Sequence, residues 1–245
     1  MTQFNSDVSD WWSTSIIDMA PGQIRFRGRP IQELIGTVTF PQMIWLMTRG
    51  DLPTPQQARL LECALVAAVD HGPQAPSIAA ARMAVTCGLG LNGAMASAVN
   101  FLDDVHGGAG EQAVELYTWI DQAVQQGADV QTATAEMIDK WQAERGIFIS
   151  GFGHRFHKPE DPRAPRLLGL VEEAAELGVV SGRFAAIGRA MQKDLNSRKG
   201  QPVPMNIDGA TAVVYAELGF AGPLARGLFC LSRSVGVIAH AWEQM

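Results

Sequence analysis

The chain is poor in cysteine and has no long apolar run, and each of these absences excludes a class of protein. Its 245 residues include only three cysteines, Cys63, Cys87 and Cys230, which are widely spaced in apolar segments. An odd, scattered set argues against a disulfide framework and predicts reduced, buried thiols in a cytoplasmic protein. No run approaches the roughly 18 apolar residues of a membrane span. The first residues also lack the basic and apolar regions of a signal peptide, so we expect a cytoplasmic chain without a membrane partner.

Positive charge is scarce as well. The chain has 19 Lys and Arg residues against 25 Asp and Glu residues, a net charge of -6. Nucleic-acid binding over a general surface needs a clustered excess of cations, so the sequence predicts no nucleic-acid partner. Hydrophobic residues make up 47% of the chain and charged residues 18%, which is on the apolar side of ordinary soluble proteins. We therefore expect copies of the chain to bury surface against one another.

Several catalytic signatures are missing from the sequence. It has no HExxH, no CxxC pair, no GxSxG and no P-loop, and its five histidines lack the local spacing of metal ligands. The sequence therefore predicts no metal site. Residues 88–93 read GLGLNG and match GxGxxG, but the segment before them has a helical pattern instead of a strand. We interpret this glycine-rich segment as a turn between two helices.

Most of the chain has helical patterning. Residues 24–39 carry the one convincing extended signal, with Ile24, Phe26 and Gly28 alternating before a short helical piece. Apolar residues at three- and four-residue spacing predict buried helices, and polar faces predict surface helices. The buried segments are 53–70, 77–87, 91–105 and 210–242, and the surface segments are 111–146 (two helices), 165–177 and 182–194. The predicted fold class is all-α, with a buried part formed from both ends of the chain and a more polar helical insertion between them.

Two polar segments that each contain a histidine follow apolar helical stretches. Asp70 to Pro73 reads DHGP, and His71 alone fits a cap at a helix C-terminus. Asp103 to Gly108 reads DDVHGG, where Gly107 and Gly108 fit a helix C-cap. A glycine pair beside His106 also lets a ligand approach the backbone closely, which makes this second segment the stronger candidate for a site.

A third polar segment, GFGHRFHKPEDPRAPR, runs from Gly151 to Arg166. Its glycines allow a sharp turn before His154, and its cationic side chains suit an anionic ligand beside a general acid or base. A solvated basic loop is an equally good interpretation of this segment alone. We interpret His157 as an ordinary polar residue on the surface of the loop.

The fourth polar segment, PMNIDG, ends at Gly209 and places Asp208 at the entry of an apolar helix. A lone Asp-Gly at a helix start is by default an N-cap. Together, however, the four segments supply three histidines, a carboxylate and a cationic cluster. That set is able to perform acid-base chemistry at carbon.

The order of these segments resembles the citrate synthase superfamily, and especially its lyase branch of citryl-CoA lyase and the lyase domain of ATP-citrate lyase. The resemblance rests on DHGP, DVHGG, GFGHRFHKPEDPR, NIDG and SRSVGVIAHAWEQ, taken in this order. It implies a nearly all-helical fold with a large domain and a smaller inserted one. On this basis we expect the large domain at 1–108 and 219–245 and the small domain at 109–218, in a homodimer or a dimer of dimers.

The resemblance also implies roles for individual residues. His106 would stabilise the enol of an acetyl thioester, His154 would contact the oxygen on the carbon that is cleaved or attacked, and Asp208 would exchange a proton with the acetyl methyl carbon. Substrate carboxylates would be bound by His71, Arg163 and Arg233. Coenzyme A would contact Gly151, Phe152, Gly153 and Arg155.

The implied activity is carbon-carbon cleavage of citryl-CoA, or of a close 3-hydroxyacyl-CoA, into acetyl-CoA and oxaloacetate. The partners would be an acyl-CoA and a small di- or tricarboxylate, with no cofactor beyond the coenzyme A of the substrate. Two alternatives stay open: a short synthase that condenses an acyl-CoA with a 2-oxo acid, and a non-catalytic ligand-binding or assembly subunit. The presence of all three catalytic-type residues disfavours the latter.

Overall fold

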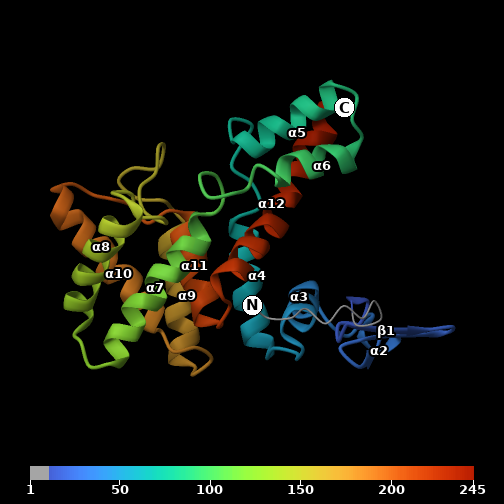
Figure 1. Ribbon diagram of the computed structural model, residues 1–245, viewed down its shortest axis with the longest axis horizontal. Helices are drawn as coiled ribbons and strands as arrows, with labels where there is room; N and C mark the ends of the chain where they lie inside the picture. The colour runs from blue at the N-terminus through green and yellow to red at the C-terminus, as the bar shows by residue number, and fades with distance from the viewer. Residues whose placement is uncertain (1–10) are drawn as a thin grey trace. The chain divides into compact units, whose positions relative to one another are not determined.

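The computed structural model describes residues 11–245, and helices dominate it (Figure 1). The all-α fold class predicted from the sequence is confirmed. The chain divides into two compact units between Arg59 and Leu60. The prediction that the N-terminus is not a signal peptide falls mainly on residues 1–10, which lie outside the described residues. The predicted large and small domains, with boundaries at 108/109 and 218/219, stay a prediction.

The first unit contains a small antiparallel sheet followed by helices. Its elements are β1 (Ile17–Ala20), β2 (Gln23–Phe26), β3 (Arg29–Pro30), α2 (Ile31–Leu34) and α3 (Phe40–Arg49). The strands pair in the order β1-β2-β3, with Ile17 opposite Phe26 and Arg25 opposite Pro30. The extended signal predicted from Ile24 is therefore confirmed in β2, whereas β1 was not predicted.

The second unit contains all the predicted site residues and begins within α4. Its helices are α4 (Pro55–Ala67), α5 (Pro76–Thr86), α6 (Leu91–Val99), α7 (Ala109–Gln125), α8 (Val130–Arg145), α9 (Arg163–Glu176), α10 (Arg183–Lys199), α11 (Ile207–Glu217) and α12 (Gly222–Gln244). The GLGLNG segment joins α5 to α6, so its interpretation as a turn is confirmed. Among the described residues, none of the helices combines the length and the apolarity that a bilayer crossing requires.

The core of this unit surrounds α11. This helix is apolar on all sides, and every residue from Gly209 to Ala216 is buried, as expected for a helix without a polar face. It packs against α7, α9 and α10. The 23-residue α12 packs with its early part near α7 and continues to α5 and α6 (Figure 1). The polar segments that join these helices are thus held by a rigid frame.

Two local predictions are wrong. The helix predicted over 91–105 ends at Val99, because the chain turns back on itself: the Asp103 carbonyl accepts hydrogen bonds from the backbone N–H groups of His106 and Gly108, at 2.9 and 3.0 Å. The cysteines are unpaired as predicted, but none of them is buried: Cys63 and Cys230 are partly exposed and Cys87 is exposed. Cys87 is exposed because it follows the last residue of α5.

Candidate functional site

A cavity of about 520 Å³ in the second unit collects most of the predicted site residues. Its lining includes His106, His154 and Asp208, the three residues with predicted catalytic roles. It also includes His71, Arg233, Gly153 and Arg155. Segments separated by about a hundred residues therefore meet in one space, as the proposed chemistry requires. Arg163, Gly151 and Phe152 are not among the lining residues.

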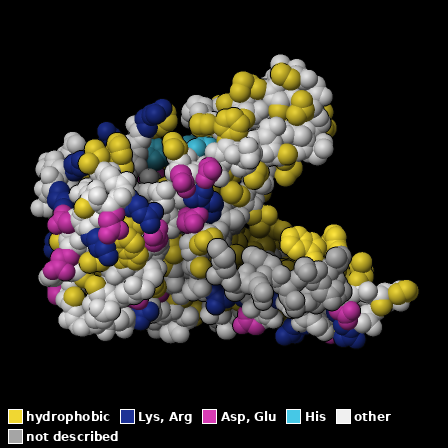
Figure 2. Space-filling view, viewed as in Figure 1, with side chains coloured by type: hydrophobic (Ala, Val, Ile, Leu, Met, Phe, Trp, Pro, Cys, Tyr) yellow, Lys and Arg dark blue, Asp and Glu magenta, His cyan; other side chains and the backbone are white. Residues whose placement is uncertain are grey.

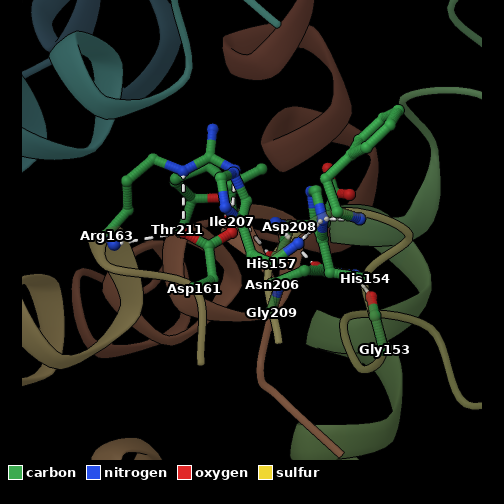
Figure 3. Close-up of polar contacts among 11 residues, drawn as sticks. Gly153, His154, His157, Asp161, Arg163, Asn206, Ile207, Asp208, Gly209 and Thr211 are labelled. Atoms are coloured by element: carbon green, nitrogen blue, oxygen red, sulfur yellow. Dashed lines mark hydrogen bonds and ion pairs between the residues drawn. The ribbon is translucent and has the colours of Figure 1, made fainter. Parts of the chain in front are cut away.

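The turn that carries His154 is joined to the segment that carries Asp208 by hydrogen bonds (Figure 3). The Gly151 carbonyl accepts from the Asn206 backbone N–H at 3.0 Å, and the Gly153 N–H donates to the Pro204 carbonyl at 2.7 Å. The Asn206 side chain donates to the Gly153 carbonyl at 2.9 Å. These contacts hold the GFGH and NIDG segments against each other.

Glycine is required at the crossing of these two segments. A Cβ atom built on Gly209 would lie 2.3 Å from the Gly151 carbonyl oxygen, and one on Gly151 would lie 2.7 Å from the Gly209 Cα. Gly151 also has a φ angle of +86°, in the left-handed region that favours glycine. Gly151 therefore holds the loop against α11, and neither Gly151 nor Phe152 lines the cavity. Of the residues predicted to contact coenzyme A, Gly153 and the exposed Arg155 reach the cavity.

His154 has a defined tautomer in this loop. Its Nδ1 atom accepts hydrogen bonds from the backbone N–H groups of Phe156 at 3.0 Å and His157 at 2.9 Å. Because Nδ1 accepts, the proton of the neutral ring lies on Nε2. Burial and the neighbouring His157 lower the pKa of His154, while Asp161 opposes the shift. His154 is thus set up as a neutral hydrogen-bond donor.

His106 is held in the opposite tautomer. Its Nε2 atom accepts from the Ser77 backbone N–H at 3.2 Å and lies 2.9 Å from the Ser77 hydroxyl. Ser77 belongs to the first turn of α5, where the positive end of the helix dipole favours a neutral ring. Burial and Arg233 lower the pKa of His106. The Nδ1–H of His106 is therefore the donor available to a ligand.

Asp208 is not the N-cap that its position suggested. The Asn206 side chain caps α11 by accepting from the backbone N–H groups of Asp208 at 3.0 Å and Gly209 at 3.2 Å. The Asp208 Oδ1 atom is buried and has no hydrogen-bond partner among the described residues. Burial raises the pKa of Asp208, although Arg233 and Arg163 partly oppose the shift. A carboxyl with a raised pKa is suited to hold and deliver a proton.

The carboxylate-binding residues of the sequence prediction lie close together but differ in exposure to the cavity. Arg233 is buried, lines the cavity and donates from Nε to the Ala68 carbonyl at 3.0 Å. The His71 ring packs edge-on against His154 at 5.3 Å between centroids. Burial and the nearby cations lower the pKa of His71 to about 4, so that it is neutral near pH 7.

Arg163 is paired with Asp161, a residue for which the sequence predicted no role. The two side chains form a bidentate pair, with distances of 2.9 Å from Nε to Oδ1 and 2.7 Å from Nη2 to Oδ2 (Figure 3). Asp161 is fully buried. Burial alone would raise the pKa of Asp161, but the hydrogen bonds from Arg163 outweigh it and lower the pKa. The sequence signal was present in the DPR motif.

His157 is a further correction. It was interpreted as a surface residue, yet it is half-buried and its ring centroid lies 4.3 Å from that of His154. Ligand-type atoms of His154, His157 and Asp161 lie within 4.8 Å of one another. Both Asp161 oxygens already accept from Arg163, however, and this cation opposes the binding of a metal ion. The prediction of a site without a metal stays a prediction.

Comparisons with known proteins agree with this geometry. The chain matches the family model "Citrate synthase, C-terminal domain" over residues 4–59 and 53–245. It is 26% identical over 225 residues to the citrate synthase of Acidithiobacillus ferridurans, covering 91% of this chain and 56% of that protein. It is 31% identical over 201 residues to the citrate synthase of Haloferax volcanii, covering 81% of this chain and 49% of that protein. The chain thus spans about half the length of the curated relatives it matches.

The chain is also similar to a solved structure whose activity differs from that of the citrate synthases above, and this match covers a larger share of the other protein. The citryl-CoA lyase of Hydrogenobacter thermophilus is 31% identical, with a TM-score of 0.81, and the match covers 95% of this chain and 86% of that one. This likeness agrees with the predicted helical fold.

Proposed function

Because the chain belongs to the citrate synthase family, as its motifs predicted, we propose that it cleaves citryl-CoA, or a close 3-hydroxy-3-carboxyacyl-CoA, into acetyl-CoA and oxaloacetate or another 2-oxo acid. The observation that carries the proposal is the single cavity that His106, His154 and Asp208 line together. Two neutral imidazoles offer N–H donors, and one carboxyl has a raised pKa. The similarity to the lyase of H. thermophilus supports the cleavage direction.

The proposed step breaks the bond between the hydroxyl-bearing carbon and the methylene carbon of the thioester. The His154 Nε2–H donates to the hydroxyl oxygen, which becomes the ketone oxygen of the 2-oxo acid as its proton passes to water. The electron pair of the broken bond enters the thioester as an enolate, whose oxygen accepts from the His106 Nδ1–H. A proton carried by Asp208, whose pKa is raised by burial, is then delivered to the methylene carbon and forms the methyl group of acetyl-CoA. Asp208 regains a proton from water.

The substrate's charges fit the cations around the cavity. Arg233 and the neutral His71 would bind substrate carboxylates, and Asp161 would orient Arg163 towards the same region. Arg155 is exposed at the cavity and would contact a coenzyme A phosphate. No cofactor beyond the coenzyme A of the substrate is needed, since these side chains supply the donors and the acid. The unpaired cysteines favour a cytoplasmic location.

A coupled assay of oxaloacetate release from citryl-CoA tests the function. The parent protein should release oxaloacetate, and His154→Ala and Asp208→Ala should each slow kcat by about 10²-fold to 10⁴-fold, as expected for loss of an acid-base group. Asp139→Ala, which removes an exposed carboxylate paired with Arg198 outside the cavity, is the control and should keep parental activity. No release by the parent, or equal rates in all four proteins, would contradict the proposal.

The condensing direction is the second candidate. The curated relatives are citrate synthases, and the His154 Nε2–H suits a ketone oxygen as well as a hydroxyl oxygen. Thiol release from acetyl-CoA in a panel of 2-oxo acids separates the two activities. Release faster than the cleavage of citryl-CoA would favour the synthase.

We also propose that the protein is a homodimer or a dimer of dimers. Leu231, Val235, Ile238 and Trp242 are exposed on α12 at spacings of four, three and four residues, so they share one face of the helix. Hydrophobic side chains are visible over the region of α5, α6 and the end of α12 (Figure 2). Such a contiguous apolar face is typical of protein interfaces. Light scattering of the purified protein would contradict this proposal if it gave the mass of one chain.

A further inference from the structure

Arg226, on α12, joins three separate carboxylates. Its Nε atom donates to Glu111, Nη1 donates to Asp103 and Nη2 donates to Asp104. Glu111 belongs to the first turn of α7, while the two aspartates begin the turn that carries His106. We call these four residues the Arg226 network. One planar guanidinium thus ties the His106 turn, residues 103–108, to two helices of the frame.

The His106 turn has few other attachments to the frame. The backbone hydrogen bonds from His106 and Gly108 to the Asp103 carbonyl are internal to the turn, and at its end the Gly108 carbonyl accepts from the backbone N–H groups of Glu111 and Gln112 in α7. The Val105 side chain is fully exposed and packs against nothing that would hold it. The side chains of Asp103 and Asp104 are 78% and 71% exposed and are held through Arg226. Leu102 and Phe229 lie against Gly107, whereas residues 103–106 are held by the Arg226 network and by the contact of His106 with Ser77.

Gly108 shows that the guanidinium lies directly against the backbone of the turn. A Cβ atom on Gly108 would be 3.0 Å from Arg226 Nη2 and 2.9 Å from the Asp103 carbonyl oxygen. The sequence suggested that the glycine pair makes room for a ligand. At Gly108, however, the space beside the backbone is occupied by the Arg226 guanidinium.

We propose that Arg226 is a positioning residue for the site: the Arg226 network fixes the His106 turn so that Nε2 stays on Ser77 and Nδ1–H points to the cavity. The catalytic consequence rests on the proposed function, whereas the effect on the ring of His106 does not. Exposed ion pairs add little to stability one by one. The network matters because it restrains the exposed residues 103–105, which have no apolar anchor of their own. A misplacement of about 1 Å can slow a reaction by about 10²-fold.

Nitrogen NMR of the histidine rings tests the proposal without any turnover. In the parent, the His106 signals, assigned by their absence in His106→Asn, should show a proton on Nδ1 and an acceptor Nε2. In Arg226→Met they should show averaging between the two tautomers, and Arg226→Lys should restore part of the parental pattern. With citryl-CoA as substrate, kcat of Arg226→Met should fall by about 10-fold to 10²-fold with little change in KM.

Arg198→Met is the matched control. Arg198 also bonds three groups, namely Asp139, Asp194 and the Ala135 carbonyl, but it ties α10 to α8 outside the cavity. This variant should lose thermal stability to a similar degree while keeping the parental His106 spectrum and kcat. Parental His106 signals in Arg226→Met would overturn the proposal. If the parent does not cleave citryl-CoA, the spectra still decide the role of Arg226. Failure of the proposed function is therefore distinguishable from failure of the proposal for Arg226.

Discussion

Replacing Gly209 by alanine is expected to remove most of the activity and to lower the stability of the protein. The added methyl carbon would start 2.3 Å from the Gly151 carbonyl oxygen, which is a backbone atom and not the end of a flexible side chain. The turn before His154 must therefore move away from α11. Overpacking of this kind typically costs about 1–3 kcal/mol. A shift of about 1 Å between His154 and Asp208 is expected to slow citryl-CoA cleavage by about 10²-fold.

The matched control is Gly169→Ala in α9. A Cβ atom at Gly169 meets nothing within 4 Å, and the residue lies in the interior of a helix. Alanine should stabilise the protein there by about 0.5–1 kcal/mol and leave kcat unchanged. Thermal unfolding and steady-state rates of both variants measure the contrast. Parental activity and melting temperature in Gly209→Ala would mean that the contact of the two glycines does not position the site.

The glycines show which part of the site could be predicted from the sequence. Short motifs with glycine, histidine and aspartate mark places where the backbone turns sharply, and this signal is local. Through the resemblance, these motifs predicted one site for His106, His154 and Asp208, and the three residues line one cavity, while their catalytic roles stay a prediction. The buried α11 was also predictable, because its apolar residues surround the whole helix.

The sequence predictions failed where the role of a residue is decided by a contact from a distant part of the chain. They also failed where two nearby residues are suited to the same position. Asn206 and Asp208 are both good N-caps, and the pattern alone does not choose between them. The Arg226 network joins residues more than a hundred positions apart, so no spacing rule predicts it. Spacing also does not predict the contact of Ser77 with His106, which lies 29 residues away. The Ala-Pro before Ser77 signals only that a helix begins there.

Asp208→Asn is expected to abolish most of the activity and, at neutral pH, to stabilise the fold. Asparagine has no proton to deliver to carbon, so kcat should fall by about 10²-fold to 10⁴-fold. The buried Asp208 carboxyl has a pKa raised above its unfolded value of 3.8, mainly because of burial. The folded protein therefore binds this proton more tightly than the unfolded chain does.

The sign of the pH dependence follows from this difference. The contribution of Asp208 to stability is fully present below the unfolded pKa and is lost as pH rises through the raised folded pKa. The amide side chain in Asp208→Asn does not ionise, so the variant lacks this loss. Denaturant unfolding across the acid to neutral range should show that the free energy of unfolding of the variant increases relative to that of the parent as pH rises. A constant difference at all pH values would mean that Asp208 is not perturbed.

Asp161→Asn supplies a control of opposite sign on the same wall of the site. Hydrogen bonds from Arg163 lower the pKa of Asp161, against the effect of its burial. Its contribution is present above the unfolded pKa and is lost as pH falls through the folded pKa. Asp161→Asn should therefore be less stable than the parent at neutral pH, and this deficit should shrink in acid. Two neighbouring carboxyls that are replaced by the same amide would then shift the stability curve in opposite directions, because burial raises the pKa of Asp208 while the hydrogen bonds from Arg163 lower the pKa of Asp161.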